Sequence, residues 1–94
     1  MLSRISINPK KIKKEDLDKE ILRDGIIAEL DAINLYEQLA AMATSKNIKR
    51  VLMDIAKEEK THMGEFQHLL LQEDKEQVRE LEKGNKEVEE LAKK

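Results

Sequence analysis

Residues 22–40 read LRDGIIAELDAINLYEQLA. At 3.6 residues per turn, the apolar residues of this stretch fall on one side of a helix and most of its polar residues on the other. Glu29 lies in the middle of the apolar side. A carboxylate there must be paired, protonated or bound to a metal, because a stranded buried charge costs several kcal/mol. The stretch therefore predicts a long helix with one inward-facing acid.

The apolar spacing extends this predicted helix over about residues 14–43. After a short polar break, a second helix is predicted over about residues 47–72, with Ser45 as its N-cap. Because the break is so short, the two helices are expected to form an antiparallel hairpin. The remaining residues have weaker apolar spacing, and we expect a short helix there that bends or stops at Gly84-Asn85.

The composition favours an all-α fold. Of the 94 residues, 39% are hydrophobic and 40% are charged, and there is one proline, a balance that suits helices better than strands. Residues 1–13 contain the helix-breaking pair Asn8-Pro9 and are predicted to be an irregular lead-in to a single domain at residues 14–94. A chain of this size buries a modest fraction of its surface, so we expect it to form oligomers.

Charge and cysteine content narrow the possible functions. The formal net charge is −2, and the 18 basic residues are interleaved with the 20 acidic ones, so we expect no nucleic-acid partner. The chain contains no cysteine, which restricts metal binding to oxygen and imidazole ligands. No apolar run approaches the roughly 18 residues of a membrane span, so we expect no membrane partner and a cytoplasmic location.

The second predicted helix carries the motif Glu59-Lys60-Thr61-His62. Its i, i+3 spacing lets a carboxylate and an imidazole face a common ion, and both residues fall within the apolar side of the helix. They could instead form a metal-free hydrogen-bonded pair in the core. The chain contains a second Glu-x-x-His motif, but its members fall on the polar outer face, where we expect them to be solvated: Glu65 and His68.

Together, Glu29, Glu59 and His62 make half of a known constellation. Ferritin-like di-iron proteins use a Glu from each of two helices and a Glu-x-x-His motif from each of the other two, and this chain has one copy of each part. Three ligands are too few for two metal ions. We therefore predict that two chains pair about a two-fold axis into a four-helix bundle, which completes a di-iron centre at their interface.

Three further residues lie near these predicted ligands. Tyr36, one heptad beyond Glu29, could hydrogen-bond a ligand carboxylate or stand beside the oxidising site, or it could be an ordinary core aromatic residue. Asp31 and Glu58 lie at the edge of the apolar side or beyond it. They could guide Fe²⁺ inward, but we expect them to be solvated acids.

Two blocks of the sequence resemble the encapsulated ferritin-like proteins: residues 28–32 followed by Tyr36, and residues 58–62. The resemblance covers about residues 21–71. It implies a subunit of two long helices and a short third one, whose homodimer completes a ferroxidase centre from the matching glutamates and histidine. It also implies a ring of ten subunits inside an encapsulin shell that stores the oxidised iron. This chain has Ala28 and Leu35 where some relatives have an acid and a tryptophan at an outer entry site.

The expected function is therefore the oxidation of Fe²⁺ to Fe³⁺ with oxygen or peroxide as acceptor. One alternative is a rubrerythrin-like peroxidase with the same di-metal site, although the chain lacks the cysteines of a built-in electron donor. Another is a metal-free helical module for protein association. The final residues contain no apolar shell-targeting tail, so we expect either a domain excised from a fusion with the shell protein or a free protein.

Overall fold

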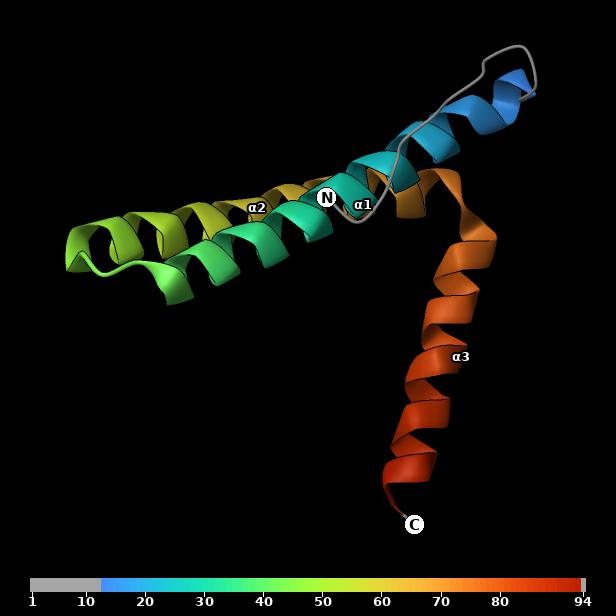
Figure 1. Ribbon diagram of the computed structural model, residues 1–94. Coiled ribbons are helices and arrows are strands. Elements are labelled where there is room, and N and C mark those ends of the chain that lie inside the picture. The colour runs from blue at the N-terminus through green and yellow to red at the C-terminus, as the bar shows by residue number, and fades with distance from the viewer. Residues whose placement is uncertain (1–12, 94) are drawn as a thin grey trace.

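The structure is a computed structural model that describes residues 13–93. Within them the chain forms three α-helices and no strand: α1 (Lys14–Met42), α2 (Lys46–Glu73) and α3 (Lys75–Ala92). Helices α1 and α2 lie side by side as an antiparallel hairpin, and α3 leaves the hairpin at a large angle (Figure 1). The predicted all-α fold is confirmed. Of the predicted lead-in, residues 1–12 lie outside the described part of the chain.

The turn of the hairpin is stabilised at both of its helix ends. Helix α1 ends where the backbone N–H of Ala43 donates to the carbonyl oxygen of Leu39 at 3.0 Å. Helix α2 begins after Ser45, whose Oγ accepts a hydrogen bond from the backbone N–H of Ile48 at 3.3 Å. This satisfies one of the donors that a helix N-terminus leaves free. The predicted N-cap is confirmed, and the short turn positions the middle of α1 against the middle of α2.

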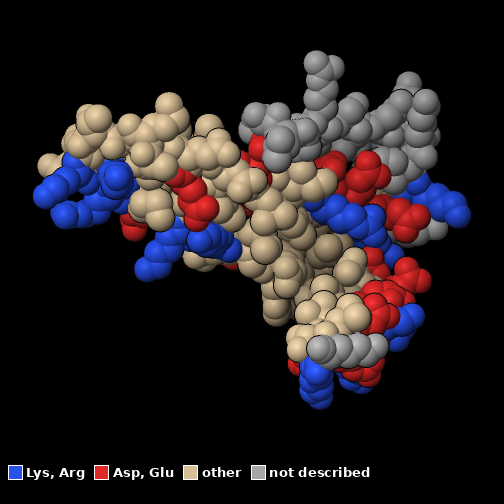
Figure 2. Space-filling view, turned by 60° about the horizontal axis from the view of Figure 1, so that its bottom comes forward, with Lys and Arg blue, Asp and Glu red and all other residues tan. Residues whose placement is uncertain are grey.

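The hairpin has a thin core and a large uncovered apolar surface. Two of its buried apolar residues, Ala40 and Ala56, are small enough to let helices approach closely. Figure 2 shows a continuous surface without charged side chains along the hairpin. An exposed apolar area of this extent is typical of an interaction surface. Large hydrophobic side chains of the hairpin that remain exposed are Ile21, Ile27, Leu30, Leu35, Leu39, Met42, Ile48, Val51, Met53 and Leu69.

Helix α3 differs from its prediction. It continues through Gly84-Asn85 without a bend or stop, and neither residue has a positive φ. A single glycine inside a helix costs about 1 kcal/mol of helix stability, and the helical turns on either side can offset this cost. The side-chain amide of Asn85 also donates a hydrogen bond to Oε1 of Glu89, one turn later, at 3.4 Å. Among the described helices, only α2 has backbone that comes close to the backbone of α3. None of the described helices is long and apolar enough to span a membrane.

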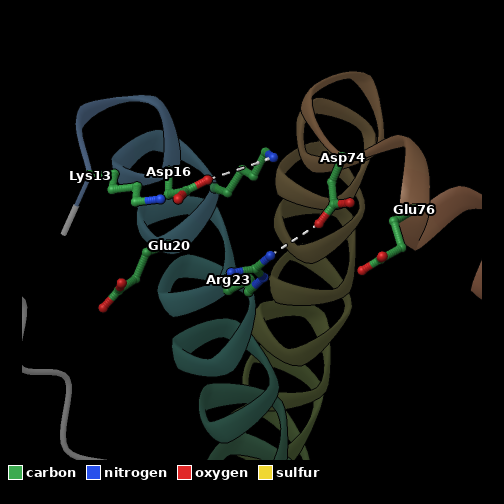
Figure 3. A pocket seen from close by; sticks show the side chains of 7 residues that line it. Lys13, Asp16, Glu20, Arg23, Asp74 and Glu76 are labelled. Carbon is green, nitrogen blue, oxygen red and sulfur yellow. Dashed lines mark hydrogen bonds and ion pairs between the residues drawn. The ribbon is translucent and has the colours of Figure 1, made fainter.

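Asp74 joins α1 to the start of α3 (Figure 3). Its Oδ1 accepts a hydrogen bond from the backbone N–H of Gln77 at 3.0 Å and so caps α3. Its Oδ2 accepts a hydrogen bond from Nη2 of Arg23, also at 3.0 Å. The hydrogen bond from Gln77 and the nearby guanidinium of Arg23 lower the pKa of Asp74. One carboxylate therefore both begins α3 and ties it to α1.

Acid is expected to release α3 from this attachment. Because the pKa of Asp74 is lowered on folding, its contribution to stability is complete above the usual Asp pKa of about 3.9 and is lost as pH falls through the lower folded value. The chain has no cysteine, so spin labels on cysteines introduced at Gln38 and Lys86 can report the distance between α1 and α3. This distance distribution should broaden on acidification, and in Arg23→Gln it should already be broad at neutral pH. A narrow distribution in Arg23→Gln would contradict this role.

Candidate metal centre

Glu29 of α1 meets Glu59 and His62 of α2 in the middle of the hairpin. Nδ1 of His62 lies 3.8 Å from Oε2 of Glu29 and 3.6 Å from Oε1 of Glu59. Each of the three residues offers one ligand atom, and these atoms all lie within 4.8 Å of one another. Two carboxylates and an imidazole at this spacing can share one cation, because each ligand atom needs to lie only about 2.0–2.2 Å from it. The structure thus brings together the three inward-facing side chains that the sequence predicts.

Local helix geometry explains the arrangement. Glu59 and His62 are three residues apart on α2, so their side chains lie on neighbouring turns of the same face. The antiparallel packing of α1 then presents Glu29 to this pair. The side chains of Glu29 and Glu59 are 17% and 20% exposed, whereas that of His62 is 46% exposed. The cluster is therefore enclosed by the hairpin on the carboxylate side and open to its surroundings on the imidazole side.

Glu29 lies in an environment that disfavours its ionised form in the absence of a cation. Its Oε2 is buried and has no hydrogen-bond partner among the described residues. Only the protonated carboxyl of Glu29 could share a hydrogen bond with Glu59, and this, together with burial and the negative charge of Glu59, raises the pKa of Glu29. A bound cation would supply the missing partner and offset the repulsion between the two carboxylates. The donor set of hard carboxylate oxygens and one imidazole suits iron among other divalent metals.

The second Glu-x-x-His motif is solvated, as the sequence predicts. Glu65 and His68 are both exposed, and Nε2 of His68 lies 3.3 Å from the side-chain nitrogen of Gln72 in the next turn. The two motifs have the same spacing, but Glu59 and His62 form a cluster with Glu29 of α1, whereas Glu65 and His68 form a pair on the surface. Position relative to the apolar side of the helix distinguishes the two motifs.

The remaining sequence candidates have different outcomes. Glu58 is exposed, as predicted, and Tyr36 is partly buried on α1, where its contribution to the site stays a prediction. Asp31 was expected to be solvated, and this is wrong, because it is only 7% exposed. It lies two residues from Glu29 and so on another side of α1.

Replacing Glu29 with glutamine is expected to stabilise the metal-free protein. The pKa of Glu29 is higher in the folded state than in the unfolded state. The protonated side chain therefore stabilises the folded state below the usual Glu pKa of about 4.3, and this stabilisation is lost as pH rises through the pKa of the folded state. Above that folded value the ionised side chain is destabilising. Glu29→Gln should therefore raise the free energy of unfolding by about 1 kcal/mol, the lower range for an unsatisfied buried polar group. Urea unfolding with a chelator at pH 7 measures this, and a less stable variant would contradict it.

Comparison with known proteins places the chain among close relatives. It is 55% identical over 93 residues to the ferritin-like-encapsulin shell fusion protein of Pyrococcus furiosus, a match that covers 93% of this chain and 27% of the fusion protein. It is 36% identical over 73 residues to an encapsulin nanocompartment cargo protein of Myxococcus xanthus, covering 78% of this chain and 55% of the cargo protein. The chain therefore spans only part of the length of either relative.

A solved structure and a family model also match this chain. The crystal structure of an encapsulated ferritin domain from Pyrococcus furiosus matches with a TM-score of 0.83 and 52% identity, covering 94% of this chain and 95% of that domain. A family model described as rubrerythrin matches residues 20–94. The resemblance to encapsulated ferritin-like proteins is confirmed. The chain belongs to the rubrerythrin family, and its helices adopt the ferritin-like fold of the encapsulated ferritin domain.

Proposed function

We propose that this chain oxidises Fe²⁺ to Fe³⁺ at a di-iron centre completed by two copies of the chain. The observation that carries the proposal is the cluster of Glu29, Glu59 and His62, with ligand atoms within 4.8 Å of one another and a buried carboxylate oxygen that has no hydrogen-bond partner among the described residues. A cation site explains why a helix hairpin keeps two acids side by side in its interior.

Three features support a second copy at the site. One chain supplies three ligands, whereas a ferritin-like di-iron centre uses four Glu and two His, which a two-fold axis would provide. The imidazole side of the cluster is also the open side, since the His62 side chain is 46% exposed. The uncharged surface along the hairpin (Figure 2) is suited to packing against another hairpin. A four-helix bundle would cover both the cluster and this surface.

In the proposed centre each side chain has a definite task. Glu29 and Glu59 hold iron through anionic oxygens, which favour Fe³⁺ over Fe²⁺. By analogy with ferritin-like sites, Glu59 would help to hold both ions and Glu29 would help to hold one. His62 supplies a neutral nitrogen, and its Nδ1 is the atom that faces both carboxylates. Two Fe²⁺ held there would give up one electron each as they become Fe³⁺, which with two protons would reduce one oxygen molecule to hydrogen peroxide or one hydrogen peroxide to two waters.

The relatives support a location beside an encapsulin shell. One is named as a fusion of a ferritin-like segment with the shell protein, and the other as a cargo protein of an encapsulin nanocompartment. We infer that this chain also works inside such a shell in the cytoplasm, with the oxidised iron stored there, and that its dimers form a larger ring. Co-expression with a shell protein and electron microscopy of the purified particles tests the association.

The direct test of the activity is a two-step experiment. Fe²⁺ is first titrated into the metal-free protein without oxygen, and the complex is then mixed with oxygen while Fe³⁺ formation is followed by absorbance. The proposal expects oxidation that is much faster than that of free Fe²⁺ and that reaches two Fe²⁺ for each pair of chains. Binding without accelerated oxidation would overturn the proposed reaction, and no binding would favour the metal-free association module.

The rubrerythrin family match supports a second candidate function, the reduction of hydrogen peroxide at the same site. This reaction consumes two electrons for each peroxide, and the cysteine-free chain would have to receive them from Fe²⁺ or from a separate donor. Supplying a reduced electron-transfer protein together with peroxide separates the two candidates. Sustained peroxide turnover without net Fe³⁺ accumulation would favour the peroxidase over the ferroxidase.

A further inference from the structure

Gly25 of α1 is the place where the two helices of the hairpin approach each other through an aromatic ring. A Cβ atom at this position would lie 3.2 Å from both Cδ2 and Cε2 of Phe66 on α2, and 3.3 Å from its Cγ. These distances are shorter than ordinary van der Waals contacts. At Gly64 and Gly84, by contrast, an added Cβ would meet no atom within 4 Å. Only at Gly25, among the three glycines, does the missing side chain make room for a neighbour.

This contact lies next to the candidate metal centre on both helices. Gly25 precedes Glu29 by four residues, and Phe66 follows His62 by four residues. Residues four apart lie above one another on the same helix face. Because the helices are antiparallel, the Gly25–Phe66 contact and the Glu29–His62 pair occupy successive layers of the same seam. The ring of Phe66 therefore helps to set how far apart α1 and α2 lie one turn from the ligands.

We propose that Gly25 is a positioning residue for the metal centre. Its lack of a side chain lets Phe66 pack against the backbone of α1, and this close packing holds Glu29 within reach of the ligands on α2. The inference rests on the metal-binding part of the proposed function, but not on the oxidation reaction. It assigns a role to a residue that cannot bind metal itself.

Metal coordination is sensitive enough for this spacing to matter. Distances in a functional site must agree with ideal metal–ligand values to within about 0.2 Å. A methyl group at position 25 would require Phe66 or the helices to move by a few tenths of an ångström to reach ordinary contact distance. That displacement is as large as the tolerance of the site. Changes in residues that orient metal ligands typically weaken metal affinity about 10- to 100-fold.

The test compares two identical substitutions in the full chain. Gly25→Ala and Gly64→Ala both add one methyl group to a helix interior and bring the same gain in helix propensity. Gly64 is exposed and has open space around it, so it is the matched control. Fe²⁺ affinity is measured by calorimetry without oxygen, and folding is checked by circular dichroism. We expect the dissociation constant to rise about 10-fold in Gly25→Ala and to be unchanged in Gly64→Ala.

A rescue variant separates positioning from general damage. Adding Phe66→Leu to Gly25→Ala removes the ring atoms that the new methyl group would meet, so it should restore Fe²⁺ affinity toward that of the unchanged protein. Equal affinity of Gly25→Ala and Gly64→Ala would overturn the inference and leave the ferroxidase proposal intact. Weakened binding in Gly25→Ala with no accelerated oxidation in the unchanged protein would support the inference and overturn the ferroxidase proposal. Absence of Fe²⁺ binding by the unchanged protein would overturn both.

Discussion

Glu59→Gln and His62→Ala are each expected to slow Fe²⁺ oxidation by about 100-fold or more. Altering a group that only orients a metal ligand already costs about 10- to 100-fold, and these variants remove the ligand itself. The proposed two-fold symmetry also doubles the number of ligands lost, because one substitution in the chain removes two of the six ligands of the completed centre. Glutamine keeps the shape of the Glu59 side chain but loses the negative charge that favours Fe³⁺.

His68→Ala is the matched control for these variants. His68 belongs to the same kind of Glu-x-x-His motif on the same helix, but it is exposed and lies beside Gln72. Stopped-flow measurement of Fe³⁺ formation should show an unchanged rate for His68→Ala and a strongly reduced rate for the two ligand variants. Rates for Glu59→Gln and His62→Ala that equal the control would remove the cluster from the proposed reaction.

Fe²⁺ is expected to drive the association of two chains in the absence of oxygen. If two ions bind only the completed centre, each contributes RT ln(1 + [L]/Kd) to the dimer, which is about 2.7 kcal/mol at a free concentration 100 times Kd. Two ions then strengthen dimerisation by about 5 kcal/mol, or roughly 10⁴-fold. No other expected effect on assembly is as large, because a single substitution on a protein surface usually changes stability by less than about 0.5 kcal/mol.

Sedimentation equilibrium with and without Fe²⁺ measures this shift directly. The Glu29→Gln variant is the control, because it leaves the apolar surface of the hairpin unchanged and removes one ligand from each chain. Its association should not respond to Fe²⁺. A metal-free protein that is already fully dimeric at the lowest concentrations would mean that the apolar surface alone holds the chains together. A chain that stays monomeric with bound iron would contradict the shared centre.

Much of the candidate site could be predicted because helix geometry relates sequence position to direction. A residue's angle around a helix follows from its number alone, so Glu29 could be placed on the inner side of α1 and Glu59 and His62 on that of α2. The same reasoning separated this motif from the exposed motif of Glu65 and His68. Loop length then determined that the helices are antiparallel, which brings the middle of one against the middle of the other.

Features that depend on contacts between distant residues were not predictable in this way. The close approach at Gly25 is one example, because nothing in the local pattern reveals that the ring of Phe66 needs the space. The attachment of α3 by Arg23 and Asp74 joins residues 51 positions apart. The burial of Asp31 likewise does not follow from the periodicity of α1.

The sequence by itself determined the two helices of the hairpin, the direction of their faces and the identity of the three inward candidate ligands. These are local properties, set by helix propensity, capping and the 3.6-residue period. The tertiary structure decided the distances: ligand atoms within 4.8 Å of one another, a phenylalanine ring against Gly25 and a third helix tied to the first at Asp74. Distances of this kind depend on how side chains from separate helices pack, and packing is a property of the assembled fold.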